Sequence, residues 1–135
     1  MSFKDYHDIL VEIADIDVEI SSIADSRRLL AELNEKEEIL IQLKRSVIGE
    51  IRSIETDHLT KKRAIMDGKN SGMFGVFGGS SKSRRIKALK KLDKDNQSKI
   101  ESYSEIKYMI EDLMVQIENI KGSMNDFIKE KLGNN

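Results

Sequence analysis

The sequence predicts an all-α protein made of long helices, and three observations carry that prediction. Its 135 residues include no proline, the residue that breaks helices most strongly. Charged residues make up 35% of the chain and there is no cysteine or tryptophan, a composition that suits long helices packed against one another. Apolar residues recur at alternating three- and four-residue spacings. The length is that of about one domain, so we expect a single helical domain over residues 1–135.

Two blocks of the chain show the helical spacing, one over residues 9–54 and one over residues 103–127. The spacing averages about 3.5 residues, which keeps one stripe of each helix facing a partner helix along its length. A strand would instead alternate every second residue. The first stripe comprises Ile9, Ile13, Ile16, Ile20, Ile23, Leu30, Leu33, Leu40, Val47, Ile51 and Ile54, and the second comprises Tyr103, Ile106, Ile110, Leu113, Ile117, Ile120, Met124 and Phe127.

Helix ends are marked by capping residues. Ser2 with Asp5 forms a capping pair at the start of the chain, and Ser81 or Ser83 is expected to cap the last helix. Glycines that follow Lys and Arg residues mark helix ends at Gly68 and Gly133. These signals predict a helix over residues 2–67, a loop over residues 68–83 and a helix over residues 84–132.

The first stripe falters near residues 22–28, where Ser22 with Asp25 can cap a new helix. Two architectures therefore remain open: a long antiparallel coiled-coil helical hairpin, or a three-helix bundle if the chain turns near residue 25. Apolar residues beside the stripes make the apolar face wider than two helices need, and we favour the hairpin associating with a second copy, most simply as a dimer. These residues are Ile39, Ile41, Ile48, Met109 and Val115.

The predicted loop combines glycine with large apolar residues. A connection of this length between helices is unusual and tends to be functional or disordered. A plain flexible linker would lack the phenylalanines, so we expect an apolar contact surface here, although a cap over the end of the bundle fits the same residues. The apolar residues are Met73, Phe74, Val76 and Phe77, among glycines at positions 72, 75, 78 and 79.

A basic segment follows the loop directly and completes the candidate site. Four of its residues, Arg84, Lys87, Lys91 and Lys94, share one helical face, with Lys82 and Arg85 beside them. Together with the apolar loop this face suits a protein partner, or alternatively an anionic membrane surface. Binding of nucleic acid is a lower alternative, because the net charge of the chain is only −1 and no nucleic-acid-reading module is present.

Opposite charges are segregated along the chain. Residues 1–25 hold seven acidic residues and one basic residue, whereas residues 68–94 hold eight basic residues and one acidic residue. The acidic residues of the first segment follow the helical spacing on a face next to the isoleucines. Such like charges favour an opposite charge on a second subunit or a partner, although solvent and salt alone suffice to accommodate a solvated face. This stripe comprises Asp5, Asp8, Glu12, Asp15 and Glu19.

The sequence offers no catalytic, cofactor or metal site. Glu55 and His58 have the spacing of a di-iron ligand pair, but a second such pair is missing. Ser80 and Ser81 separate the glycines from Lys82 and so break the spacing of a phosphate-binding loop. The acidic start is unlike a signal peptide and no apolar stretch is long enough to span a bilayer, so we expect a cytoplasmic protein.

These features together predict a structural or adaptor protein rather than an enzyme. It would self-associate through coiled-coil helices and bind a protein partner through the loop and the basic face. The alternative is a peripheral membrane-binding module that uses the same residues.

Overall fold

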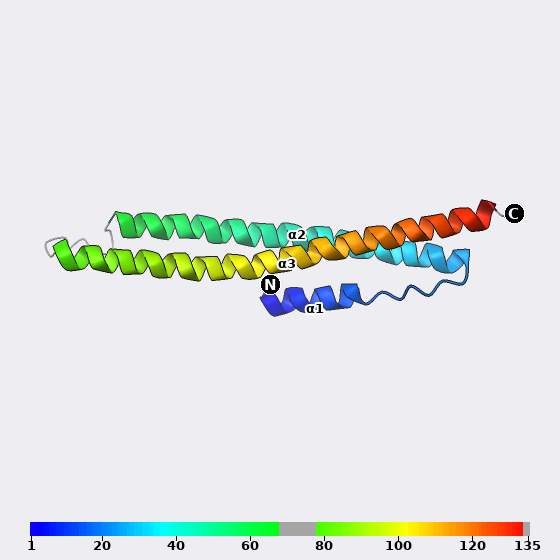
Figure 1. Cartoon of the computed structure of the whole chain (residues 1–135), viewed down its shortest axis with the longest axis horizontal. Coiled ribbons are helices and arrows are strands. Elements are labelled where there is room, and N and C mark those ends of the chain that lie inside the picture. Colours follow the sequence, from blue (N-terminus) through cyan, green and yellow to red (C-terminus); the bar gives the residue numbers. More distant parts are fainter. Residues whose placement is uncertain (68–77, 134–135) are drawn as a thin grey trace. The chain divides into compact units, whose positions relative to one another are not determined.

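The computed structural model describes residues 1–67 and 78–133, and these residues form three helices with no strand among them (Figure 1). Helix α1 spans Phe3–Ala14, α2 spans Ile23–Met66 and α3 spans Gly78–Gly133. The predicted all-α class is confirmed. The ends expected near residues 67 and 132 agree with the observed ends of α2 and α3 to within one residue.

The first two helices begin at the predicted capping residues. The Asp5 backbone N–H donates to Ser2 Oγ at 3.2 Å, and the Ser2 N–H donates to Asp5 Oδ2 at 2.9 Å, which is a reciprocal capping box. At the start of α2, the Asp25 N–H donates to Ser22 Oγ at 3.1 Å. Both predicted caps are therefore confirmed.

The capping hydrogen bonds also lower the pKa of the two aspartates. The backbone N–H of Ser2 has the largest effect on the pKa of Asp5, and the Ser21 hydroxyl has the largest effect on that of Asp25. Because the pKa is lowered in the folded chain, the carboxylates stabilise the helix ends at neutral pH. That stabilisation is lost only as the pH falls through the lowered pKa values.

The break between the first two helices lies over residues 15–22, not over residues 22–28 as predicted. The sequence there alternates acidic residues with the β-branched Ile16, Val18 and Ile20, which favour extended backbone over helix. The Asp17 carboxylate accepts a hydrogen bond from the Glu19 N–H at 3.1 Å, a local bond that competes with helix formation. As a consequence, Asp15 and Glu19 of the predicted acidic stripe lie outside any helix.

The start of α3 is also earlier than predicted. The helix begins at Gly78, so Ser81 and Ser83 lie inside it and neither caps its start. Glycine costs only about 1 kcal/mol in a helix relative to alanine, which the long helix that follows can offset. Most of the predicted loop, residues 68–77, lies outside the described residues.

Contacts divide the chain into two compact units. Unit 1 comprises residues 1–47 and 105–135, and unit 2 comprises residues 48–104. Helices α2 and α3 contribute to both units, whereas α1 belongs to unit 1 alone.

Three helices meet in unit 1, and they bury its core. In this unit α1 runs antiparallel to α2: the Tyr6 hydroxyl lies 2.6 Å from Ser46 Oγ, and Lys36 Nζ donates to the Asp15 carbonyl at 2.8 Å. Ion pairs join α2 to α3, also in antiparallel order, between Lys44 and Glu111 at 3.3 Å and between Glu37 and Lys121 at 3.4 Å.

All the buried apolar side chains found in the described ranges belong to unit 1. On α3 they all belong to the predicted stripe, but on α2 the buried Leu29 and Leu43 lie outside it and the predicted Leu30 is only half-buried. Three come from α1, so this core depends on the third helix. The set comprises Tyr6, Leu10, Ile13, Leu29, Leu33, Leu40, Leu43, Val47, Ile106, Ile110, Leu113, Ile117 and Met124.

Unit 2 contains only two helices, and its seam is half-buried. On α2 the seam holds Ile51, Ile54, His58 and Ile65, and on α3 it holds Leu89, Leu92, Asn96 and Ile100, all of intermediate exposure. Two helices alone leave both sides of their seam open to solvent. This difference in burial distinguishes the part of the molecule that carries the predicted site.

Candidate partner-binding surface

The structure places the basic half of the predicted site on α3 in unit 2. Lys82, Arg84, Lys87, Lys91 and Lys94 are exposed, and Arg85 is half-buried. The apolar half, comprising Met73, Phe74, Val76 and Phe77, lies outside the described residues. We call the exposed residues Arg84, Lys87, Lys91 and Lys94 the basic face, because their spacing sets them along one side of the helix.

The cations of the basic face are neighbours on the surface of α3, because they follow one another at spacings of three and four residues. Like charges at these spacings destabilise a helix by some tenths of a kcal/mol per pair. Within the part of the chain that the structure describes, no ion pair joins any lysine or arginine between residues 82 and 94 to a carboxylate. An anionic group bound at this face would therefore relieve an existing repulsion.

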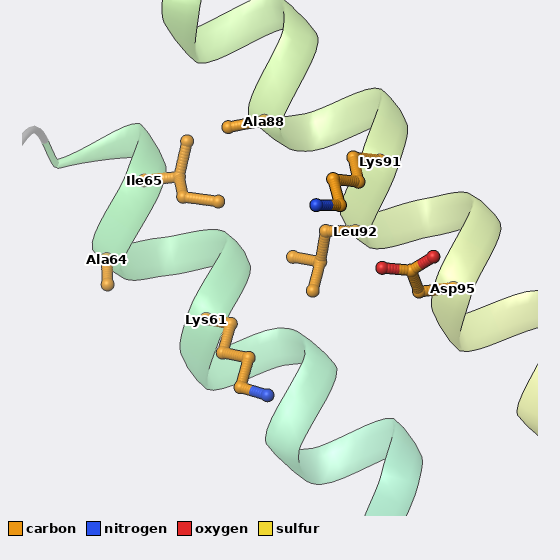
Figure 2. A pocket seen from close by; sticks show the side chains of 7 residues that line it. All are labelled: Lys61, Ala64, Ile65, Ala88, Lys91, Leu92 and Asp95. Carbon is orange, nitrogen blue, oxygen red and sulfur yellow. The ribbon is translucent and has the colours of Figure 1, made fainter.

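A shallow groove of about 360 Å³ runs beside the basic face, between α2 and α3 of unit 2 (Figure 2). Ile65 and Leu92 point into the space between the two helices and give the groove an apolar floor. The single methyl groups of Ala64 and Ala88 leave its sides open. Lys61, Lys91 and Asp95 complete the lining, so the groove joins an apolar floor to a mostly cationic rim.

Polar residues interrupt the apolar seam between α2 and α3 near this groove. His58 Nε2 lies 3.1 Å from Asp93 Oδ1 of α3, and this contact becomes an ion pair when the imidazole is protonated. Two buried polar atoms, His58 Nδ1 and Arg85 Nε, have no hydrogen-bond partner among the described residues. Buried polar atoms normally have hydrogen-bond partners, so the hydrogen-bonding groups of this seam are less completely paired than is usual for buried positions.

Within the described ranges, no group of three or more histidine, cysteine, aspartate or glutamate side chains is arranged to hold a metal ion. The contact that His58 makes is with Asp93 across the seam, which suits the alternative role of a partly buried polar residue.

Sequence reasoning missed the groove. Its floor residues Ile65 and Leu92 fall between the two predicted stripes, the first of which ends at Ile54 and the second of which begins at Tyr103. Two signals were available: this gap in the stripes, and the alanines at positions 64 and 88. Small residues beside a seam leave space, but only the pairing of the two helices shows that these alanines flank one groove.

The described helices contain no segment that is both long and apolar enough to cross a membrane. No family model, no curated protein and no solved structure matches this chain.

Proposed function

We propose that this chain is a non-enzymatic structural or adaptor protein. Its α2 and α3 form an antiparallel coiled-coil hairpin that self-associates, most simply as a dimer. The loop with Phe74 and Phe77, together with the basic face, binds a protein partner.

The observation that supports this proposal best is the contrast in burial between the two units. Where α1 joins α2 and α3, side chains such as Leu33 and Ile110 are fully buried. Where only two helices pack, the equivalent positions stay half-exposed and an apolar-floored groove remains. A further helix, supplied by a second copy or by a partner, would remove that apolar surface from water and stabilise the seam.

Self-association is tested by sedimentation equilibrium at micromolar concentration. We expect a mass greater than the 15.4 kDa of a single chain, with a dimer as the simplest species. A dissociation constant of about 100 μM corresponds to a binding free energy of only about 5.5 kcal/mol. A chain that is monomeric at every concentration up to that value would therefore reject the self-association proposal.

The exposed basic face supports one alternative function, a peripheral module that binds anionic membranes. Segments that bind the membrane interface typically combine cations on one side of a helix with apolar side chains nearby, as the basic face does with Phe74 and Phe77. The lysines would then lie near lipid headgroups, and the phenylalanines would insert among the acyl chains. Nucleic-acid binding stays a lower alternative. It would use the same phosphate-attracting cations without reading sequence.

A double substitution, Phe74→Ser with Phe77→Ser, tests whether the loop is a contact surface. We expect helicity and oligomeric state to stay close to those of the parent chain, while capture of partner proteins from the native host is lost. Flotation with vesicles containing an anionic lipid is run in parallel, because loss of vesicle binding instead would favour the membrane alternative.

The matched control is Phe3→Ser, which removes another exposed phenylalanine from a different part of the chain and should leave binding unchanged. A double variant that melts much earlier than the parent chain would show that the phenylalanines belong to the core and that the loop is a cap.

A further inference from the structure

The structure displays two unneutralised surfaces of opposite charge, and they suggest how copies of the chain associate. We propose that the acidic segment of one copy lies against the basic face of another. The acidic segment is the run of exposed carboxylates comprising Asp8, Glu12, Asp15, Asp17 and Glu19. The inference rests on the self-association proposed above and adds the surfaces that make the contact.

The acidic segment has one cationic neighbour along the chain and few across it. Lys4 lies one turn before Asp8 but makes none of the ion pairs found among the described residues, and no lysine or arginine occurs between Asp5 and Arg27. Helix α1 uses its apolar side to pack in unit 1 through Tyr6, Leu10 and Ile13, which leaves its carboxylates in solvent. Lys36 approaches only the backbone carbonyl of Asp15, at 2.8 Å, and its ion pair is with Glu32.

The basic face is the natural complement of this segment within the same sequence. Residues 82–94 hold seven basic residues against one acidic residue, Asp93, and Asp93 is already engaged by His58. Other charges of the helices pair locally, as Lys44 and Lys107 do with Glu111. The acidic segment and the basic face are two runs of like charge, opposite in sign, whose members take part in none of the ion pairs found among the described residues.

A second copy fits these surfaces better than an unrelated ligand because every copy carries both of them. Contact of each acidic segment with the basic face of the other copy makes the interface reciprocal, and reciprocal interfaces close into dimers. A single exposed ion pair contributes at most about 1 kcal/mol. Several such pairs, formed twice in each dimer, are needed for a stable contact and make it sensitive to salt.

Charge reversal with complementation tests this arrangement. One variant carries Asp8→Lys and Glu12→Lys, and the other carries Lys87→Glu and Lys91→Glu. In sedimentation equilibrium at low salt, we expect each variant alone to dimerise at least tenfold more weakly than the parent chain. An equimolar mixture should recover the parent affinity, because in the mixed dimer both contacts are again between opposite charges.

Two controls keep the result specific. Asp126→Lys with Glu130→Lys reverses two exposed carboxylates elsewhere on α3 and should leave dimerisation unchanged. The helicity of each variant should match that of the parent chain, and so should its thermal midpoint at concentrations at which every chain is monomeric, since all the reversed positions are exposed.

The outcomes separate the two proposals. If the parent chain dimerises but both reversed variants do so equally well, or if the mixture fails to recover, the charge-paired arrangement is wrong while self-association stands. If the parent chain is monomeric and binds anionic vesicles through Lys87 and Lys91, self-association and the arrangement built on it are both overturned.

Discussion

Replacing Ile110 by Asp is expected to destabilise unit 1 by about 4 kcal/mol or more. The Ile110 side chain is 0% exposed, and it lies next to the ion pair between Lys44 and Glu111 that joins α3 to α2. The substitution removes a buried apolar side chain and leaves a carboxylate without a partner, and both changes oppose folding. Such a loss is a large fraction of the 5–15 kcal/mol that typically holds a domain folded.

Thermal and urea unfolding followed by circular dichroism measure this effect. The matched control is Ile86→Asp, the same change on the same helix at a side chain that is 47% exposed. An exposed substitution of this kind normally changes stability by less than about 0.5 kcal/mol. Equal midpoints for the two variants would contradict the assignment of Ile110 to the core.

Replacing Tyr6 by Ala is expected to release α1 from the other two helices. The Tyr6 side chain is 0% exposed and its hydroxyl is hydrogen-bonded to Ser46. Truncation of a buried aromatic side chain costs about 3–5 kcal/mol. Helix α1 has only 12 residues, too few to be a stable helix alone in water, so once released it should also unfold.

Hydrogen exchange resolves this release residue by residue. We expect the amides of α1 to lose protection by roughly two to four orders of magnitude, in line with that loss of free energy. Amides at the centre of α3 should lose less.

Two controls separate the contributions to this effect. Tyr6→Phe keeps the ring and removes only the hydrogen bond, at a cost of about 1 kcal/mol, and Val11→Ala changes a side chain of α1 that is 57% exposed. If Tyr6→Ala behaved like Tyr6→Phe, packing of the ring would not be what holds α1.

Local chemistry explains which parts of the fold could be predicted. The N-caps of α1 and α2 were correct, because a serine followed three residues later by an aspartate forms its hydrogen bonds within one turn. The cap predicted for α3 was wrong, since Ser81 and Ser83 lie inside that helix. The buried residues of α3, from Ile106 to Met124, all belong to the predicted stripe, because a spacing of three and four residues suits only a helix. On α2 the prediction missed Leu29 and Leu43, which widen the buried face beyond a single stripe.

The break in the chain was misplaced because its sequence supports two periodicities. Ile13, Ile16 and Ile20 fit the helical spacing, whereas Ile16, Val18 and Ile20 fit the alternation of an extended segment. One contact that favours the extended form comes from Lys36, which is 21 residues away from the Asp15 carbonyl it reaches. Such a contact depends on the antiparallel packing of α1 on α2, and no local pattern reveals it.

The candidate site was predicted only in part, for a similar reason. The basic face is a property of one helix and was readable from spacing alone. The groove beside it requires Ile65 of α2 and Leu92 of α3 to meet across the seam, which depends on the register of two helices far apart in sequence. The predicted apolar half, from Met73 to Phe77, lies outside the described residues.

The connection over residues 15–22 makes α1 a tethered ligand of its own chain. A short tether holds the helix near its docking site at an effective concentration in the millimolar range, so contacts that would be weak between separate molecules are enough to keep it bound. Lengthening the tether lowers that concentration only slowly, since doubling a loop costs about 0.6 kcal/mol. The fraction of molecules in which α1 is docked on α2 and α3 is therefore set mainly by its three buried side chains, Tyr6, Leu10 and Ile13. The length of the connection over residues 15–22 has little effect on it.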